Sequence, residues 1–337
     1  MTRTDFEEMD DVTATTVRDA EIIQLPRRVV SGSVHVRPAT VTGPPAPVTE
    51  LHPRPEPEPE PGFLRGAARF LRKRLTGDYP VDDFGFDPEF TDAVLMPPLR
   101  AIFDKWFRVD VTGAANLPAG TGALVVANHS GTVPWDAVMT SVAVHDNHPE
   151  GRHLRMLGAD LLFKVPMLGS LARKTGTTLA CSEDARRLLA AGEVVGVWPE
   201  GFKGIGKPFA QRYQLQRFGR GGFVTTALRA GVPIIPCSIV GAEEIHPKIA
   251  DLQPLAKLLG LPYFPVTPLF PLLGPLGAIP LPTKWTIDFG EPIRTDLAAP
   301  DTDQDHAAVL EIADQVRATI QTKLDGMVAA RESVFGG

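Results

Sequence analysis

Short apolar runs alternate with amphipathic stretches along the chain from Leu124 onward. Apolar runs bounded by turn residues predict buried strands, and apolar residues at helical spacing predict helices. The predicted strands are Leu124–Ala127, Leu154–Leu157, Thr177–Ala180, Val194–Trp198, Ile234–Val240 and Trp285–Phe289. The predicted helices are Met96–Phe107, Asp136–Val144, Met167–Lys174, Glu183–Ala191 (capped by Ser182), Gly222–Ala230 and Asp305–Met327. This alternation predicts a single α/β domain.

The first part of the chain lacks any such pattern. Met1 to Pro61 is rich in proline and charge, and it closes with a Pro-Glu alternation from Pro55 to Pro61. Such repeats favour extended polyproline II and repel themselves, so residues 1–61 are predicted to be a disordered tail and residues 62–337 the folded domain. The acidic start has no charged-then-apolar leader, which predicts a cytoplasmic protein.

Two stretches bear on contact with a membrane. Phe63–Leu75 has apolar residues at helical spacing and a basic opposite face, so it either packs on the domain or lies on an anionic membrane surface. Leu252–Pro282 is strongly apolar but too rich in proline for a spanning helix. It either packs over the sheet or forms an apolar lip that touches the bilayer. The net charge of -6 predicts no general attraction to nucleic acid.

A polar motif, Asn128-His129-Ser130-Gly131, directly follows the first of the alternating strands. The carboxyl end of a strand is where open α/β sheets keep their sites. Asp136, at the start of the next helix, can accept a hydrogen bond from one ring nitrogen of His129 and leave the other nitrogen free as a base. Alternatively, Asp136 only complements the helix dipole and His129 is a polar loop residue.

A second polar motif, Pro199-Glu200-Gly201-Phe202-Lys203, follows the strand Val194–Trp198, and the loop continues to Lys207. Its backbone N–H groups and two lysines can bind phosphate or carboxylate oxygens. The segment also fits the first part of a nucleotide-binding P-loop. Pro208, however, stands where that motif needs Ser or Thr to bind magnesium, which argues against a nucleotide triphosphatase.

Asn128-His129 with a downstream acid, together with Trp198-Pro199-Glu200-Gly201, resembles the glycerolipid (lysophospholipid) acyltransferase family. Two further blocks agree with that family in order: Phe163 to Gly169 running to Gly176, and Gly231 to Pro236 followed by Val240 to Glu244. The resemblance covers about Leu117 to Pro292. It implies an acyltransferase-type domain with a mixed, largely parallel sheet flanked by helices.

The resemblance also implies a reaction, in which a fatty acyl group moves from acyl-CoA or an acyl carrier protein thioester to a glycerolipid hydroxyl. The protein is then peripheral to the inner face of the membrane and uses no metal and no cofactor beyond the thioester. His129 is the general base and Asp136 orients it. An acyl-Ser130 intermediate is a weaker alternative, since Ser130 has no separate base. The predicted substrate-binding residues are Asn128, Ser130, Gly131, Pro199, Glu200, Gly201, Phe202, Lys203 and Lys207.

The sequence departs from the family pattern in three places. Six residues separate His129 from Asp136 where four are usual, so the loop must bulge if the two are to meet. Phe202-Lys203 replaces the usual Thr-Arg, and Ser182 stands where the second block ends in Arg. Because Lys binds phosphate only as a point charge, these changes favour a mono- or diacylglycerol acceptor over lysophosphatidic acid. Three other arginines can still supply a phosphate site: Arg212, Arg217 and Arg220.

Two non-catalytic interpretations remain open. A lipid-binding protein on the same fold is expected if the longer loop keeps Asp136 away from His129, and a phosphate-binding protein if only Gly201–Lys207 is functional. Three histidines also lie near Asp146 in the sequence: His145, His148 and His153. Their spacing matches no closed zinc site, so they are interpreted as solvated loop residues.

Overall fold

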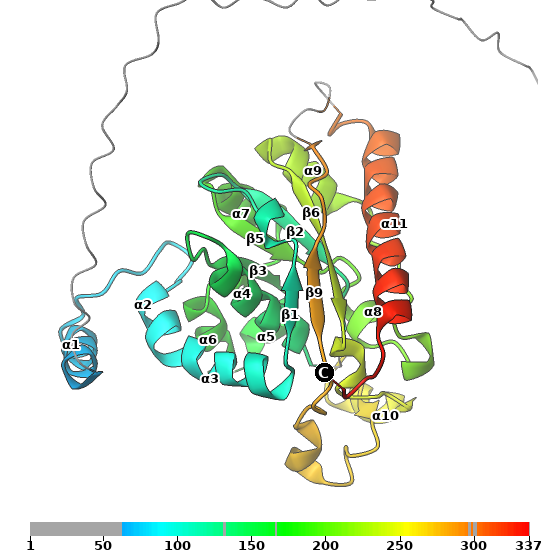
Figure 1. The fold of residues 1–337 in the computed structure, drawn as a ribbon, viewed down its shortest axis with the longest axis horizontal. Coiled ribbons are helices and arrows are strands. Elements are labelled where there is room, and N and C mark those ends of the chain that lie inside the picture. Colours follow the sequence, from blue (N-terminus) through cyan, green and yellow to red (C-terminus); the bar gives the residue numbers. More distant parts are fainter. Residues whose placement is uncertain (1–62, 131–132, 166, 296–297, 299–301, 337) are drawn as a thin grey trace, which may run out of the picture. The chain divides into compact units, whose positions relative to one another are not determined.

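The described part of the chain contains a seven-stranded mixed sheet (Figure 1). The computed structural model describes residues 63–130, 133–165, 167–295, 298 and 302–336, so the predicted tail and Gly131 lie outside it. The strand order is β1-β9-β6-β2-β5-β3-β4. The strands are β1 (Asp110–Thr112), β2 (Ala123–Ala127), β3 (Leu154–Gly158), β4 (Thr178–Leu179), β5 (Val194–Val197), β6 (Ile234–Val240) and β9 (Thr286–Phe289). Among the described strands of this sheet, only β6 and β9 pair antiparallel, which confirms the predicted largely parallel sheet.

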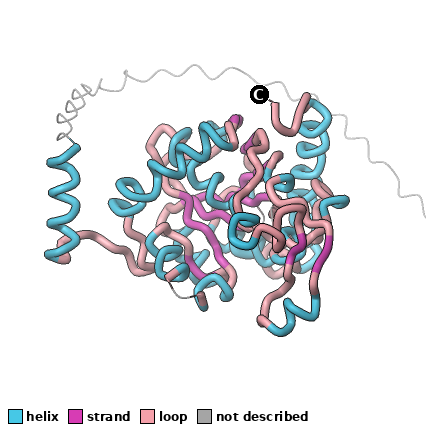
Figure 2. The backbone as a smooth tube through the Cα atoms, turned by 90° about the horizontal axis from the view of Figure 1, so that it is seen from below, coloured by secondary structure: helices cyan, strands magenta, loops and turns pink. Residues whose placement is uncertain are grey.

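Helices cover both faces of this sheet (Figures 1 and 2). The two neighbours Val125 and Val126 of β2 belong to different apolar cores, one on each face. The first core includes residues of α3 (Met96–Ala101) and α4 (Trp135–Asn147). The second includes residues of α7 (Ser182–Ala190), α9 (Gly222–Ala230) and α11 (His306–Ala330). A strand buried on both faces reads as a continuous apolar run, which is why the sequence pattern located β2 and β6 well.

Some predicted elements differ in detail. Ser182 is the first residue of α7 and makes no capping hydrogen bond, because Cys181 occupies the cap position. The predicted helix Met96–Phe107 is part of a longer helical segment that starts at Pro88 with α2 and contains π-helical turns at Thr91–Leu95 and Ile102–Trp106. The sequence pattern missed the short strand β1. The remaining helices are α1 (Phe63–Thr76), α2 (Pro88–Phe90), α5 (Asp160–Lys164), α6 (Leu168–Lys174), α8 (Phe202–Ile205) and α10 (Gln253–Leu258).

The basic side chains at the end of α1 are partly engaged by the protein. The Arg74 guanidinium donates to Asp87, with Nη2 2.9 Å from Oδ1, and Lys73 Nζ lies 2.9 Å from Glu89 Oε1. These pairs support packing on the domain for this end of the helix. The apolar Leu71 and Leu75 remain exposed.

The proline-rich apolar segment lies at the surface. The short strands β7 (Ala250–Asp251) and β8 (Pro265–Val266) pair within it, and α10 and a 3-10 helix at Gly274–Ala278 flank them. Most of its leucines are exposed, reaching 84% for Leu272, whereas Leu255, Leu269 and Leu281 are half-buried. This favours the apolar-lip alternative. Across the described ranges, no helix has the length and apolarity needed to cross a membrane.

Candidate active site

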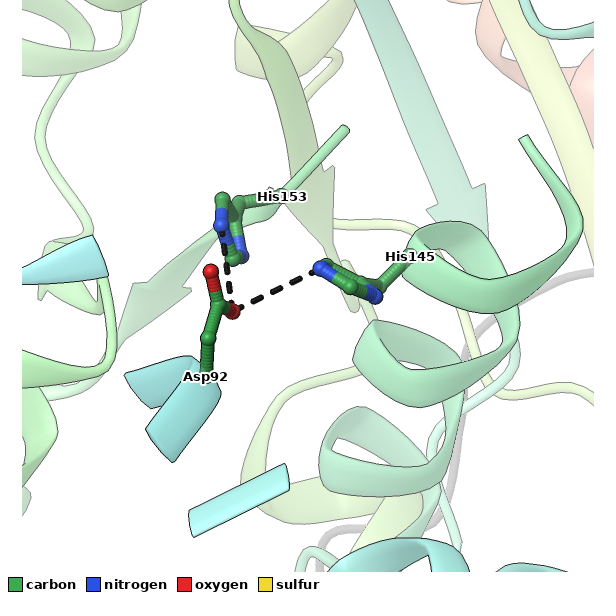
Figure 3. Close-up of side chains that lie close together, drawn as sticks. All are labelled: Asp92, His145 and His153. Atoms are coloured by element: carbon green, nitrogen blue, oxygen red, sulfur yellow. Dashed lines mark ion pairs between the residues drawn. The ribbon is translucent and has the colours of Figure 1, made fainter. Parts of the chain in front are cut away.

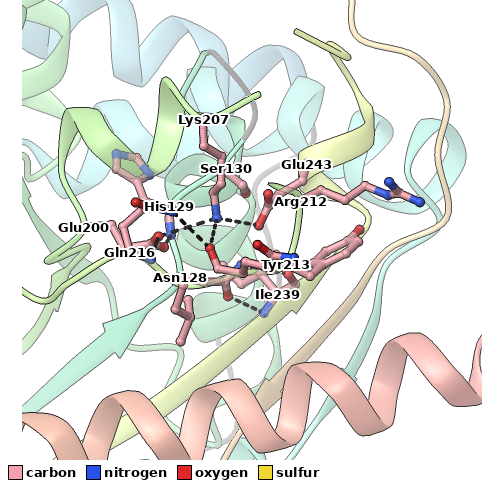
Figure 4. A network of polar contacts seen from close by, with 12 residues as sticks. Asn128, His129, Ser130, Glu200, Lys207, Arg212, Tyr213, Gln216, Ile239 and Glu243 are labelled. Atoms are coloured by element: carbon pink, nitrogen blue, oxygen red, sulfur yellow. Dashed lines mark hydrogen bonds and ion pairs between the residues drawn. The ribbon is translucent and has the colours of Figure 1, made fainter. Parts of the chain in front are cut away.

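Three loops that follow parallel strands meet at one edge of the sheet. Because β5 and β6 both pair parallel with β2, their carboxyl ends lie side by side. This arrangement brings together His129 after β2, Glu200 after β5 and Glu243 after β6 (Figure 4). The two polar motifs therefore meet at the carboxyl ends of neighbouring strands, where open α/β sheets keep their sites.

Asn128 fixes the path of the chain as it leaves β2. Its Nδ2 donates to the Ile239 carbonyl at 3.0 Å, and its Oδ1 accepts from the Ile239 N–H at 2.8 Å (Figure 4). The residue is fully buried. Both ends of the amide are thus bonded to β6, which anchors the residue directly before His129. The predicted contact of Asn128 with substrate stays a prediction.

His129 and Asp136 are in contact despite the longer loop. The His129 Nδ1 lies 2.7 Å from Asp136 Oδ2, and the same oxygen accepts from the Ser130 N–H at 3.0 Å. Asp136 lies in the first turn of α4 and is fully buried. An ionised carboxylate only accepts hydrogen bonds, so it favours the tautomer with the proton on Nδ1. Nε2 has no hydrogen-bond partner among the described residues, and the His129 side chain is 14% exposed.

Glu200 holds the backbone of His129 in place. Its Oε1 accepts from the His129 N–H at 2.8 Å, and its Oε2 accepts from the Gln216 N–H at 2.7 Å (Figure 4). The side chain is completely buried. Both carboxylate oxygens of Glu200 are thus bonded to backbone N–H groups, and its predicted role in binding substrate stays a prediction.

Two glycines allow the second loop to approach His129. Gly201 has φ 55° and ψ -143°, a combination that side chains with a Cβ rarely adopt. A Cβ on Gly204 would lie 2.9 Å from the Cβ of His129 and 2.7 Å from that of Glu200. Gly204 of α8 therefore packs directly against the Cβ and the backbone oxygen of His129.

Lys207 is buried between two carboxylates. Its Nζ lies 3.0 Å from Glu243 Oε1 and 3.4 Å from Glu200 Oε2, and it donates to the Gln214 carbonyl at 3.2 Å (Figure 4). With a side chain only 4% exposed, its ammonium is engaged with protein acceptors. This differs from the predicted substrate contact, and it argues equally against the phosphate-binding interpretation of the loop.

One cation is thus buried with two acids. Burial raises the pKa of Glu243 from its ordinary value of 4.5 to about 7, against the opposing attraction of Lys207, and the charge of Glu200 adds to the rise. The sequence resemblance already placed Glu243 in its fourth block but assigned it no role. Nothing in the sequence indicated Gln216 as a partner of Glu200.

The other predicted site residues divide into exposed and buried ones. Gly201, Phe202 and Lys203 are exposed, whereas Pro199 is half-buried. Ser130 is buried, and its hydroxyl has no hydrogen-bond partner within the described ranges. The three arginines that follow the loop are also exposed, and Arg212 Nε lies 3.7 Å from a Glu244 oxygen. Gly131 lies outside the described residues.

Comparisons with known proteins point to one family. Residues 108–240 match the family model described as Acyltransferase. The uncharacterized proteins Rv0502 of Mycobacterium tuberculosis and ML2427 of Mycobacterium leprae are 58% and 59% identical over 271 residues, covering 80% of this chain and 75% and 74% of those proteins. A 1-acyl-sn-glycerol-3-phosphate acyltransferase of Chlamydomonas reinhardtii is 25% identical over 191 residues, which is 50% of this chain and 55% of that protein.

A solved structure, the 1-acyl-sn-glycerophosphate (LPA) acyltransferase PlsC from Thermotoga maritima, is similar with a TM-score of 0.48 and 18% identity, covering 80% of this chain and 90% of that one. The matched range of the family model contains both polar motifs and the His129–Asp136 contact. The chain belongs to the glycerolipid acyltransferase family.

Proposed function

We propose that this acyltransferase moves a fatty acyl group from a thioester to a hydroxyl of a glycerolipid, with His129 as the general base. The observation that carries the proposal is the 2.7 Å contact of His129 Nδ1 with the buried Asp136, which leaves Nε2 available. The donor is acyl-CoA or an acyl carrier protein thioester. The chemistry requires no further cofactor.

In the proposed reaction, Nε2 of His129 takes the proton of the acceptor hydroxyl while that oxygen attacks the thioester carbonyl carbon. Asp136 stabilises the imidazolium that forms. Collapse of the tetrahedral intermediate breaks the carbon–sulfur bond, and the imidazolium returns its proton to the leaving thiolate. The products are an ester and a free thiol, and the imidazole ends neutral.

Two alternatives fit the geometry less well. A non-catalytic lipid-binding protein was expected if Asp136 stood away from His129, and the two are in contact. An acyl-serine mechanism needs a base bonded to the Ser130 hydroxyl. That hydroxyl is buried, and no residue in the described part of the chain hydrogen-bonds to it.

The identity of the lipid acceptor depends on which exposed residues near His129 can bind its headgroup. Lys207 is engaged with Glu200 and Glu243, so Lys203 is the exposed lysine of the loop. A single lysine is a weaker phosphate ligand than an arginine fork. This supports a neutral mono- or diacylglycerol as the first acceptor to test. The named algal relative, a 1-acylglycerol-3-phosphate acyltransferase, makes lysophosphatidic acid the second.

The test is thiol release from long-chain acyl-CoA, and from the matching acyl carrier protein thioester, with monoacylglycerol and lysophosphatidic acid in parallel. His129→Ala should lower the rate by about 10²–10⁴-fold, the usual contribution of a general base. His306→Ala removes an exposed histidine from the start of α11 and should leave the rate unchanged. If His129→Ala releases thiol at an undiminished rate, the proposed mechanism is wrong. If neither acceptor stimulates thiol release from either thioester, the proposed function is wrong.

A further inference from the structure

A second cluster of polar side chains lies away from the candidate active site. Asp92 from the π-helical turn after α2, His145 from the last turn of α4 and His153 from the loop before β3 converge on one point (Figure 3). The Nε2 atoms of His145 and His153 each lie 3.4 Å from Asp92 Oδ1. The interpretation of His145 as a solvated loop residue was wrong: it is helical and only 16% exposed. His148 is buried and outside the cluster.

The spacing of these atoms matches a transition-metal site. Zinc binds imidazole nitrogens and carboxylate oxygens at about 2.0–2.2 Å in tetrahedral geometry, so neighbouring ligand atoms lie about 3.3–3.5 Å apart. The two distances to Asp92 fall in this range. All three ligand atoms lie within 4.8 Å of one another. The atoms that are farther apart than this spacing must move closer together when a metal ion binds.

The orientation of His145 also suits a metal ligand. Its Nδ1 lies 2.9 Å from Asp146 Oδ1 and 3.2 Å from Arg100 Nη2, and its Nε2 faces Asp92. The nearer carboxylate favours the tautomer with the proton on Nδ1, which leaves the lone pair of Nε2 for a metal ion. Asp146 is held by the guanidinium of Arg100, at 2.7 Å from Nε and 2.6 Å from Nη2. Metal-binding histidines commonly donate their second nitrogen to such a carboxylate. On the other side, the His153 ring packs edge-on against Phe86 at 5.0 Å between centroids.

We propose that Asp92, His145 and His153 form a binding site for a borderline divalent metal ion of the zinc class. Two imidazole ligands select zinc, cobalt, nickel or copper over magnesium and calcium, which prefer oxygen ligands. The partial exposure of Asp92 leaves room for a water molecule as the fourth ligand. Without a metal, the same atoms can form only hydrogen bonds or pairs between Asp92 and protonated histidines.

The site has a structural consequence rather than a catalytic one. His145 and Asp136 lie on the same helix, nine residues and therefore about 14 Å apart along its axis. A metal ion would cross-link the helical segment at residues 88–106 to the end of α4 and to the start of β3. It would bind only the folded protein and stabilise it by mass action.

The experiment is a titration of chelator-treated, tag-free protein with Zn²⁺, followed by calorimetry and by the thermal midpoint. One Zn²⁺ should bind per chain, and the midpoint should rise with Zn²⁺ concentration. Co²⁺ should give the visible absorption of a four-coordinate site. The variants Asp92→Asn, His145→Gln and His153→Gln should each abolish saturable binding and the cobalt spectrum. Asp146→Asn should weaken binding about 10–100-fold, because it only orients His145.

Two matched controls keep the result specific. Asp104→Asn changes an exposed acid in the same helical segment, and His306→Gln changes an exposed histidine in α11. Both should bind Zn²⁺ like the unchanged protein. The midpoints of all variants without metal show whether each one folds. The proposal is overturned if the unchanged protein binds no Zn²⁺, if a folded ligand variant binds as tightly as the controls, or if Mg²⁺ competes equally.

Discussion

The imidazole of His129 and the carboxylate of Asp136 are joined at 2.7 Å across a loop that is two residues longer than the family spacing. The same Asp136 oxygen also accepts from the N–H of Ser130, so it contacts both the side chain of His129 and the backbone of the next residue. Glu200 holds the N–H of His129 from the other side. The contact therefore depends on where the two ends of the loop are anchored and tolerates extra residues between them.

Asp136→Asn should lower kcat by about 10²–10⁴-fold with little change in KM. An asparagine amide facing Nδ1 can donate, which shifts the ring proton to Nε2 and leaves no free base there. The measurement is steady-state kinetics together with nitrogen NMR of the histidine tautomer. Asp104→Asn, an exposed acid, is the control for the loss of one charge. An active Asp136→Asn variant with the proton on Nε2 would contradict the proposed mechanism.

Lys203 in α8 and Lys207 just after it should respond differently to the loss of their charge. Lys207→Met leaves Glu200 and Glu243 buried without their cation, and should destabilise the fold by about 3–5 kcal/mol. Lys203→Met, at an exposed position, should change stability by less than about 0.5 kcal/mol. Denaturant unfolding measures both.

Steady-state kinetics then test whether Lys203 has a role in acceptor binding. If Lys203 binds the acceptor phosphate, Lys203→Met raises KM for lysophosphatidic acid and leaves KM for monoacylglycerol unchanged. Equal stability of the two variants would contradict the structural role assigned to Lys207.

The sequence pattern predicts the central strands well because they are buried on both faces. β2 is an uninterrupted apolar run and β6 is apolar apart from Ser238, and such runs have few alternative structures. The strand β1 has only three residues, two of them exposed, so its pattern carries little signal. The π-helical turns between Pro88 and Trp106 are likewise invisible in apolar spacing, since they depend on local backbone hydrogen bonds.

The candidate site was predictable in position but less so in its inner contacts. His129 and Glu200 each follow the end of an apolar strand, and a polar residue of a catalytic type at that position can be recognised in the sequence. Whether a polar side chain faces the substrate or the protein depends on partners distant in sequence. Asn128 bonds to Ile239 and Lys207 to Glu243, contacts that no local pattern shows. The same holds for Asp92, which meets His145 only through the fold.

The elevated pKa of Glu243, about 7, predicts a pH dependence of stability. Between pH 4.5 and 7 the folded protein keeps the Glu243 proton while the unfolded chain loses it, so stability falls as pH rises through this window. Glu243→Gln removes the effect. From pH 5 to 8 the variant should lose about 3 kcal/mol less than the unchanged protein, because one pKa unit corresponds to about 1.4 kcal/mol.

The measurement for Glu243 is denaturant unfolding at several pH values. Histidines and other acids titrate in both proteins and cancel in the difference. Glu311→Gln, at an exposed position of α11, is the control and should show no such pH dependence. Parallel stability curves for Glu243→Gln and the unchanged protein would rule out the raised pKa.

Membrane binding should depend on the apolar lip. Leu272 and Leu276 are 84% and 65% exposed, so replacing both with serine should not disturb the fold. Burying one leucine in lipid contributes about 1.5–3 kcal/mol, and the double variant should lose at least about tenfold in vesicle binding. The matched control is Leu71→Ser with Leu75→Ser on α1, which are 60% and 87% exposed. Cosedimentation with phosphatidylcholine vesicles, with and without anionic lipid, compares them. Each variant replaces two exposed leucines, so the two differ mainly in where the apolar area is lost. Loss of binding confined to the α1 variant would contradict the prediction and assign membrane contact to α1.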